Sequence, residues 1–374
     1  MDKRITGRTI CKSLLAAIFI GFSVYLMMFR SALKWTFEQK EYWFAAGELC
    51  IVFVILAYIL HKTSHNIRLC LCASGCTILV FCYLHAYFYA FLIGSIYMVF
   101  LYLLGRTIGQ CMGLRDVQNA SGLFNIVFGM AGEMLIVSAL SLVKMGTSHQ
   151  VRIAFIILFA ALLLLDRKYI RTLGHRIANI RLQNNNRKIY SILAAAIITM
   201  VLLQIGRANI SLDYDSVWYG LRSEYMLAPY GGIYDKVTSA GLVYTYGKGI
   251  ETVCLPFAGL TSYGFIYSVN IFFAIGILVC IFKICRSYVS TTKSLYAVLA
   301  VSVTPGVMNM AVTAKSDIAT TFLELVAVYA AVRAIRHEDE LFGVAIGACM
   351  KCPQKVRQKF NAKIVQAAER ACCL

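Results

Sequence analysis

The sequence predicts an all-α polytopic membrane protein with about ten transmembrane helices and a large outer loop between spans seven and eight. Sixty per cent of the 374 residues are hydrophobic and 14% are charged, whereas soluble domains have about 45–50% and about 25%. Apolar runs of around 20 residues, the length that crosses a bilayer, recur along the chain. Helices are expected because they satisfy their own backbone polar groups in lipid.

The apolar runs define the expected spans in order. The first follows a basic N-terminal segment, and no small-residue cleavage site comes after it, so we expect a retained span rather than a secretory signal. Two runs, near 152–166 and 294–311, are short for a bilayer. The ten spans lie near residues 13–29, 43–61, 67–85, 87–105, 122–143, 152–166, 189–206, 264–284, 294–311 and 318–335.

Charge predicts the orientation. Residues 167–188 contain seven Lys and Arg residues and no acidic residue, which is typical of a cytoplasmic loop. With a cytoplasmic N-terminus, six spans return the chain to that side, and the loop 207–263 lies outside. The net charge of +18 sits in short loops between spans, as orientation signals do, and therefore does not indicate nucleic-acid binding. We expect an integral protein of a bacterial plasma membrane.

Three regions follow from this organisation. Residues 1–188 form an N-terminal six-span membrane module. Residues 189–340 contain four further spans and the outer loop. Residues 341–374 form an atypical basic tail in which ten apolar residues, too few to cross a bilayer, precede a lysine-rich stretch. We expect a truncation or a shifted reading frame in this tail.

Two acidic motifs are the candidate catalytic groups. Asp213-Tyr-Asp215 opens the outer loop about six residues beyond span seven. A carboxylate at this level can act as a general base toward a hydroxyl, and Asp215 could bind Mg²⁺ or Mn²⁺ through oxygen. Asp317 precedes span ten, and Glu324 lies seven residues further on the same helical face, roughly 10 Å deeper. An acidic residue within a span usually faces a bundle interior or a wet cavity.

Each motif has a simpler interpretation. The aspartates of the loop could be solvated neighbours of an aromatic interfacial belt, and Glu324 could form a hydrogen bond between spans. Glu48 and Glu133 are similar acids inside spans. The cations Arg222, Lys248 and Lys315 are candidates for binding a lipid phosphate, or they could extend along the interface toward water.

The arrangement of residues from about 189 to 336 resembles the GT-C superfamily of polyprenyl-phosphate-dependent glycosyltransferases. A span leads into an outer loop that opens with Asp213-Tyr-Asp215, and a span containing Thr304-Pro305 precedes Lys315-Ser-Asp317. The resemblance implies a catalytic acid/base at Asp213 or Asp215, and a role for Asp317 in shaping the site or binding metal. The chain departs from the family pattern because its acidic loop follows the seventh span rather than the first.

The sequence and the resemblance together predict an integral membrane glycosyltransferase. It would move a sugar from a polyprenyl-phosphate donor to a glycan, lipid or protein acceptor on the outer face, with Arg222, Lys248, Lys315 and Glu324 binding substrate. No HExxH, GxSxG or Rossmann glycine motif is present, so no nucleotide cofactor is expected. The alternatives are a transporter or flippase of polysaccharide or lipid-linked glycan, and a noncatalytic envelope assembly protein. The catalytic prediction requires Asp213, Asp215 and Asp317 to share one pocket.

Overall fold

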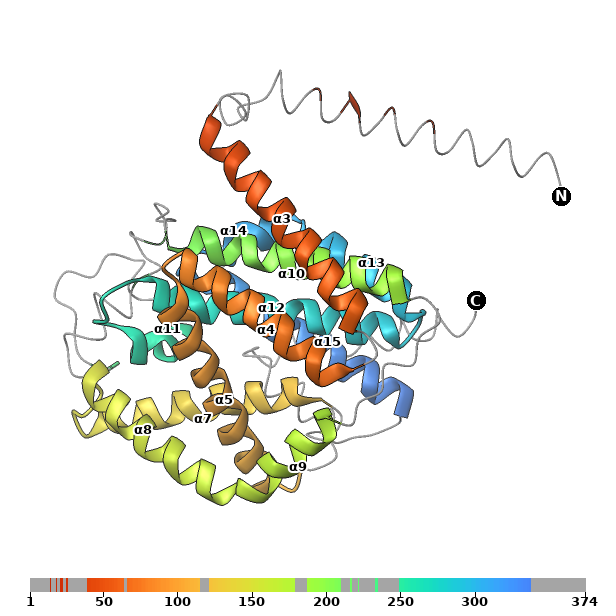
Figure 1. The fold of residues 1–374 in the computed structure, drawn as a ribbon. Coiled ribbons are helices and arrows are strands. Elements are labelled where there is room, and N and C mark those ends of the chain that lie inside the picture. The colour runs from red at the N-terminus through yellow and green to blue at the C-terminus, as the bar shows by residue number, and fades with distance from the viewer. Residues whose placement is uncertain are drawn as a thin grey trace. The chain divides into compact units, whose positions relative to one another are not determined.

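The computed structural model describes residues 39–63, 66–114, 121–178, 187–209 and 249–337, together with isolated positions that include Ser216 and Leu221. The chain divides into two compact units, residues 1–55 and 56–374, and each is described by itself. All regular elements of the described residues are helices (Figure 1), so the predicted all-α class is confirmed.

Most predicted spans correspond to helices. Within the described residues, α3, α5, α7, α8, α10 and α12 are long and apolar enough to cross a membrane, and α4 is a shorter apolar helix. The predicted first span lies mostly outside the described residues. These helices are α3 (Lys40–Thr63), α4 (Ile67–Leu84), α5 (Phe88–Cys111), α7 (Gly122–Leu142), α8 (Ser148–Leu165), α10 (Arg187–Ala208) and α12 (Gly264–Arg286).

The predicted ninth span is not one helix. Residues 291–302 form α13 (Thr291–Ser302), and a second helix, α14 (Pro305–Met310), follows after a break. Pro305 causes the break, because a proline restricts the residue before it to extended backbone, and Thr304 has φ −69° and ψ 122°. At a rise of about 1.5 Å per residue, α13 is about 18 Å long and shorter than the hydrocarbon core. The tenth span is confirmed as a helix, α15 (Asp317–His337).

Contacts between helix ends show how the second unit is ordered. Where the chain leaves α10, Asn209 Nδ2 donates to His85 O in the turn between α4 and α5. At this same end Tyr87 Oη donates to Gly264 O at the start of α12, and Arg207 contacts Asn309 in α14. We call this the loop end. The ends of α4 and α10 and the starts of α5 and α12 therefore lie together at the loop end.

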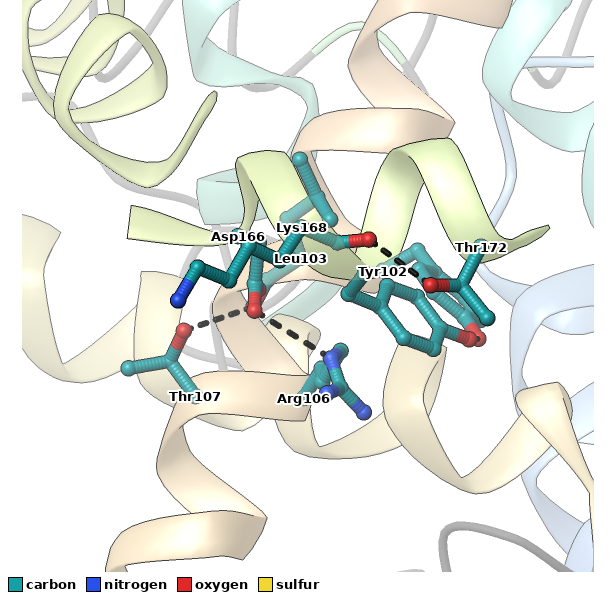
Figure 2. A network of polar contacts seen from close by, with 8 residues as sticks. Tyr102, Leu103, Arg106, Thr107, Asp166, Lys168 and Thr172 are labelled. Carbon is teal, nitrogen blue, oxygen red and sulfur yellow. Dashed lines mark hydrogen bonds and ion pairs between the residues drawn. The ribbon is translucent and has the colours of Figure 1, made fainter. Parts of the chain in front are cut away.

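The opposite end, which we call the basic end, contains the segment predicted as the cytoplasmic loop. Its first half is a helix, α9 (Arg167–Ala178), which follows α8 directly after Asp166. Figure 2 shows Arg106 of α5 beside Asp166, and their ion pair spans 3.3 Å. The Arg106 guanidinium also lies 3.6 Å from the ring centre of Tyr169, an arrangement that adds cation–π attraction. These contacts hold the start of α9 against α5.

Candidate functional site

The candidate site is built around residues 309–317 at the loop end. Asn270 of α12 is buried, and its Nδ2 donates to Thr313 O at 2.6 Å and to Lys315 O at 2.8 Å. These two bonds satisfy backbone carbonyls in an irregular segment, where no helix or strand ladder supplies the acceptors with donors. Asn270 therefore fixes the backbone that carries Lys315 and leads into Asp317.

The outer loop reaches this same segment. The buried Ser216 accepts a hydrogen bond through its Oγ from the backbone N–H of Ala314, at 2.9 Å. Ser216 is the residue directly after Asp215 in the sequence. Two stretches of chain 98 residues apart are thus joined at the loop end, one beside the first acidic motif and one beside the second.

Asp317 begins α15 and opens a polar face on that helix. Asp317, Thr320, Thr321 and Glu324 are exposed, and their spacing places them on one side of an α-helix. The other side packs on α12, where Phe322 stacks on Phe273 with ring centres 5.3 Å apart. The prediction that Asp317 and Glu324 share a face agrees with this exposure. Neither carboxylate has a hydrogen bond or ion pair with a described residue.

The described residues contain only part of the predicted site. Lys315 is half-buried, whereas Asp317 and Glu324 are exposed, and all three belong to the 309–324 region. The other candidates lie outside the described residues, so their roles stay predictions. These are Asp213, Asp215, Arg222 and Lys248.

Sequence reasoning missed a cation at the loop end. Arg207 Nη1 donates to Gln204 Oε1 and Nη2 donates to Asn309 Oδ1, both at 3.2 Å. Both acceptors are neutral amides, and Arg207 makes no ion pair with a described residue. Among the described residues, no carboxylate therefore compensates its positive charge beside α14. The signal in the sequence was its position at the end of span seven, just before the acidic motif.

Glu133, one of the acids predicted inside a span, joins helices. It is fully buried in α7 and contacts Tyr97 Oη of α5, which also donates to Val253 O at 2.8 Å. The Tyr97 hydroxyl, shared between Glu133 and Val253 O, thus ties α5 and α7 to α11 (Gly249–Cys254).

Beside this contact lies Cys254, the last residue of α11. Burial, with a smaller contribution from Glu133, raises the pKa of the Cys254 thiol to about 12, because the desolvated thiolate is disfavoured. Among the described residues, no group of three or more His, Cys, Asp and Glu residues is arranged to hold a metal ion. The predicted ligand Asp215 is not among them.

Comparison with known families identifies the C-terminal part of this region. Residues 261–355 match the family described as dolichyl-phosphate-mannose-protein mannosyltransferase. Searches of curated proteins and of solved structures gave no significant match. The matched residues include Lys315, Asp317 and Glu324 but exclude Asp213 and Asp215. The match confirms the resemblance to the GT-C superfamily, and it indicates a membrane glycosyltransferase of the GT-C type.

Proposed function

We propose that this protein transfers a sugar from a polyprenyl-phosphate donor to an acceptor hydroxyl at the outer face of the membrane, and that the loop end is its active site. The observation that carries the proposal is the hydrogen bond from Ala314 N to Ser216 Oγ. It holds the residue after Asp215 against the segment that leads into Asp317. The family match over residues 261–355 supports glycosyl transfer as the reaction.

The acidic residues have separate roles in this proposal. Asp213 or Asp215 takes the proton from the acceptor hydroxyl as a general base. The acceptor oxygen then bonds to the anomeric carbon while the bond from that carbon to the phosphate oxygen breaks, and the lipid phosphate leaves with the electron pair. Asp317, exposed at the start of α15 and without an ion pair to any described residue, orients the acceptor or holds a divalent cation. Mg²⁺ and Mn²⁺ suit such carboxylate oxygens.

The cations of the loop end stabilise the leaving phosphate. Negative charge grows on the bridging phosphate oxygen as its bond to carbon breaks, and fixed positive groups lower the energy of that transition state. Lys315 lies two residues before Asp317, and Arg207 adds a charge that no described carboxylate neutralises. We propose that Arg222 and Lys248 join them from the outer loop. Glu324 then lines the deeper part of the substrate path.

The test is transfer of radiolabelled sugar from a synthetic polyprenyl-phosphate donor in membranes containing single variants. Asp213→Asn, Asp215→Asn and Asp317→Asn each remove one charge with little change in size. Loss of the general base should lower the rate by about 10²- to 10⁴-fold. Glu41→Gln, at an exposed position in the first turn of α3, is the matched control and should keep full activity. Normal transfer by all three aspartate variants would overturn the proposal.

A further inference from the structure

An apolar groove runs between α5 and α8, and none of its lining residues belongs to the segment 309–317 or to the matched region 261–355. Its volume is about 240 Å³. An engineered apolar cavity of about 150 Å³ holds benzene, so the groove has room for a length of hydrocarbon chain. The residues that line it include Ile96, Phe100, Phe155, Ile156, Phe257 and Arg152.

Arg152 is the charged residue of this groove. Its Nε donates to Ser148 O at 3.1 Å, and Nη2 donates to Ser148 Oγ and to Ala258 O. All three acceptors are neutral, and Nη1 makes no hydrogen bond with a described residue. The side chain also lies in the second turn of α8, near the positive end of the helix dipole, where a cation is unfavourable and an anion is stabilised. The site therefore concentrates positive charge, and no carboxylate among the described residues forms an ion pair with Arg152.

We propose that this groove binds a membrane phospholipid, with one acyl chain between α5 and α8 and the phosphate on Arg152. We infer an acyl chain because, apart from Arg152, the residues of α5 and α8 that line the groove are apolar or aromatic. We infer a phosphate because the Arg152 guanidinium, whose Nη1 has no hydrogen bond to a described residue, can donate to phosphate oxygens. Lipid is the appropriate source of both, since α5 and α8 are long and apolar enough to cross a membrane.

The dimensions favour a phospholipid over the long-chain sugar donor. The groove follows α5 from Ile93 to Phe100, seven residues and therefore about 10 Å along the helix axis. That length fits part of one acyl chain, whereas a polyprenyl chain would extend far beyond it. Pro256, Phe257 and Leu260, from the segment just before α12, also line the groove. The bound lipid would thus contact the polypeptide segment just before α12. Binding of this lipid does not depend on the proposed function.

The experiment uses the full chain in nanodiscs with a phosphatidylglycerol that carries a diazirine in its acyl chain. After irradiation, mass spectrometry should find the adducts on peptides that contain Ile96 and Ile156. Arg152→Gln should lower this labelling about tenfold, as expected for loss of a charged hydrogen bond, and Arg152→Lys should restore part of it. Arg171→Gln, at an exposed position of α9, is the charge control and should leave labelling unchanged.

A second pair of variants tests the groove itself. Ile156→Trp should fill the groove and abolish labelling, whereas Ile157→Trp should not, since Ile157 is equally apolar, similarly exposed and not part of the lining. Thermal melting of each variant checks that the fold is kept. Equal labelling by a diazirine diacylglycerol, which lacks the phosphate, would overturn the role of Arg152. Preferential labelling by a diazirine polyprenyl phosphate would overturn the assignment to a phospholipid.

Discussion

Replacing Asn270 by leucine should loosen the segment that carries Lys315. Leucine has a similar size and no donor, so Thr313 O and Lys315 O would lose their bonds to Nδ2. Loss of these two bonds, one buried and one part-buried, destabilises the segment by about 1–3 kcal/mol each, or about 2–6 kcal/mol together. Asn270 Oδ1 is itself buried without a hydrogen-bond partner, so its removal stabilises the segment by about 1–3 kcal/mol. The net expected loss is about 1–3 kcal/mol.

This loss is local and can be measured by hydrogen exchange. A change of about 1–3 kcal/mol in local opening corresponds to about 5- to 150-fold faster exchange. The expected effect falls on the amide of Ala314, which bonds to Ser216 Oγ, and on its neighbours. Sugar transfer should fall as well, because Asp317 follows this segment directly.

The matched control is Asn209→Leu. Asn209 also donates from its side-chain amide to a backbone carbonyl, that of His85, but the bond is 3.4 Å long and exposed. Its loss should change exchange little, because water replaces the partner. If Asn270→Leu left both the exchange of residues 311–317 and the transfer rate unchanged, Asn270 would not position the site.

Two further predictions concern the bundle. At pH 8, N-ethylmaleimide should modify the exposed Cys111 of the folded protein but not the buried Cys254. The thiolate is the reactive form, and the pKa of the Cys254 thiol is raised to about 12. Peptide mapping before and after denaturation measures the modification, and rapid labelling of Cys254 in the folded chain would contradict its burial. Gly105→Ala should lower the melting temperature, because a Cβ there would overlap the Asn125 backbone of α7 and overpacking destabilises by about 1–3 kcal/mol. Gly75→Ala, where a Cβ meets no atom within 4 Å, is the control, and equal melting of the two variants would refute the close crossing of α5 and α7.

The spans could be predicted because the bilayer fixes their length. About 20 apolar residues are needed to cross it, and the predicted runs near 122–143 and 264–284 correspond to α7 and α12 within a few residues. The run near 294–311 was misjudged because its composition is apolar on both sides of Pro305. Prolines are tolerated within membrane helices, so composition did not reveal that the helix ends there.

The geometry of the candidate site could be predicted only where one helix carries the residues. Helical periodicity was sufficient to place Asp317 and Glu324 on one face of α15. Asn270 and Arg207 were missed because their roles depend on partners 43 or more residues away in the sequence. Such tertiary pairing leaves no periodic pattern in a single sequence. The role of Glu133 was open for the same reason, until its contact with Tyr97 showed that it joins two helices.

The hydrogen bond between Ser216 and Ala314 has a consequence for biosynthesis. The ribosome adds about 5–20 residues per second, so the 98 residues between the two partners take about 5–20 s to make. During that interval the loop that carries Ser216 has no partner segment to bind. Assembly of the proposed site must therefore wait until residues 309–317 have been made, and a chaperone or protease would meet the loop before its partner exists.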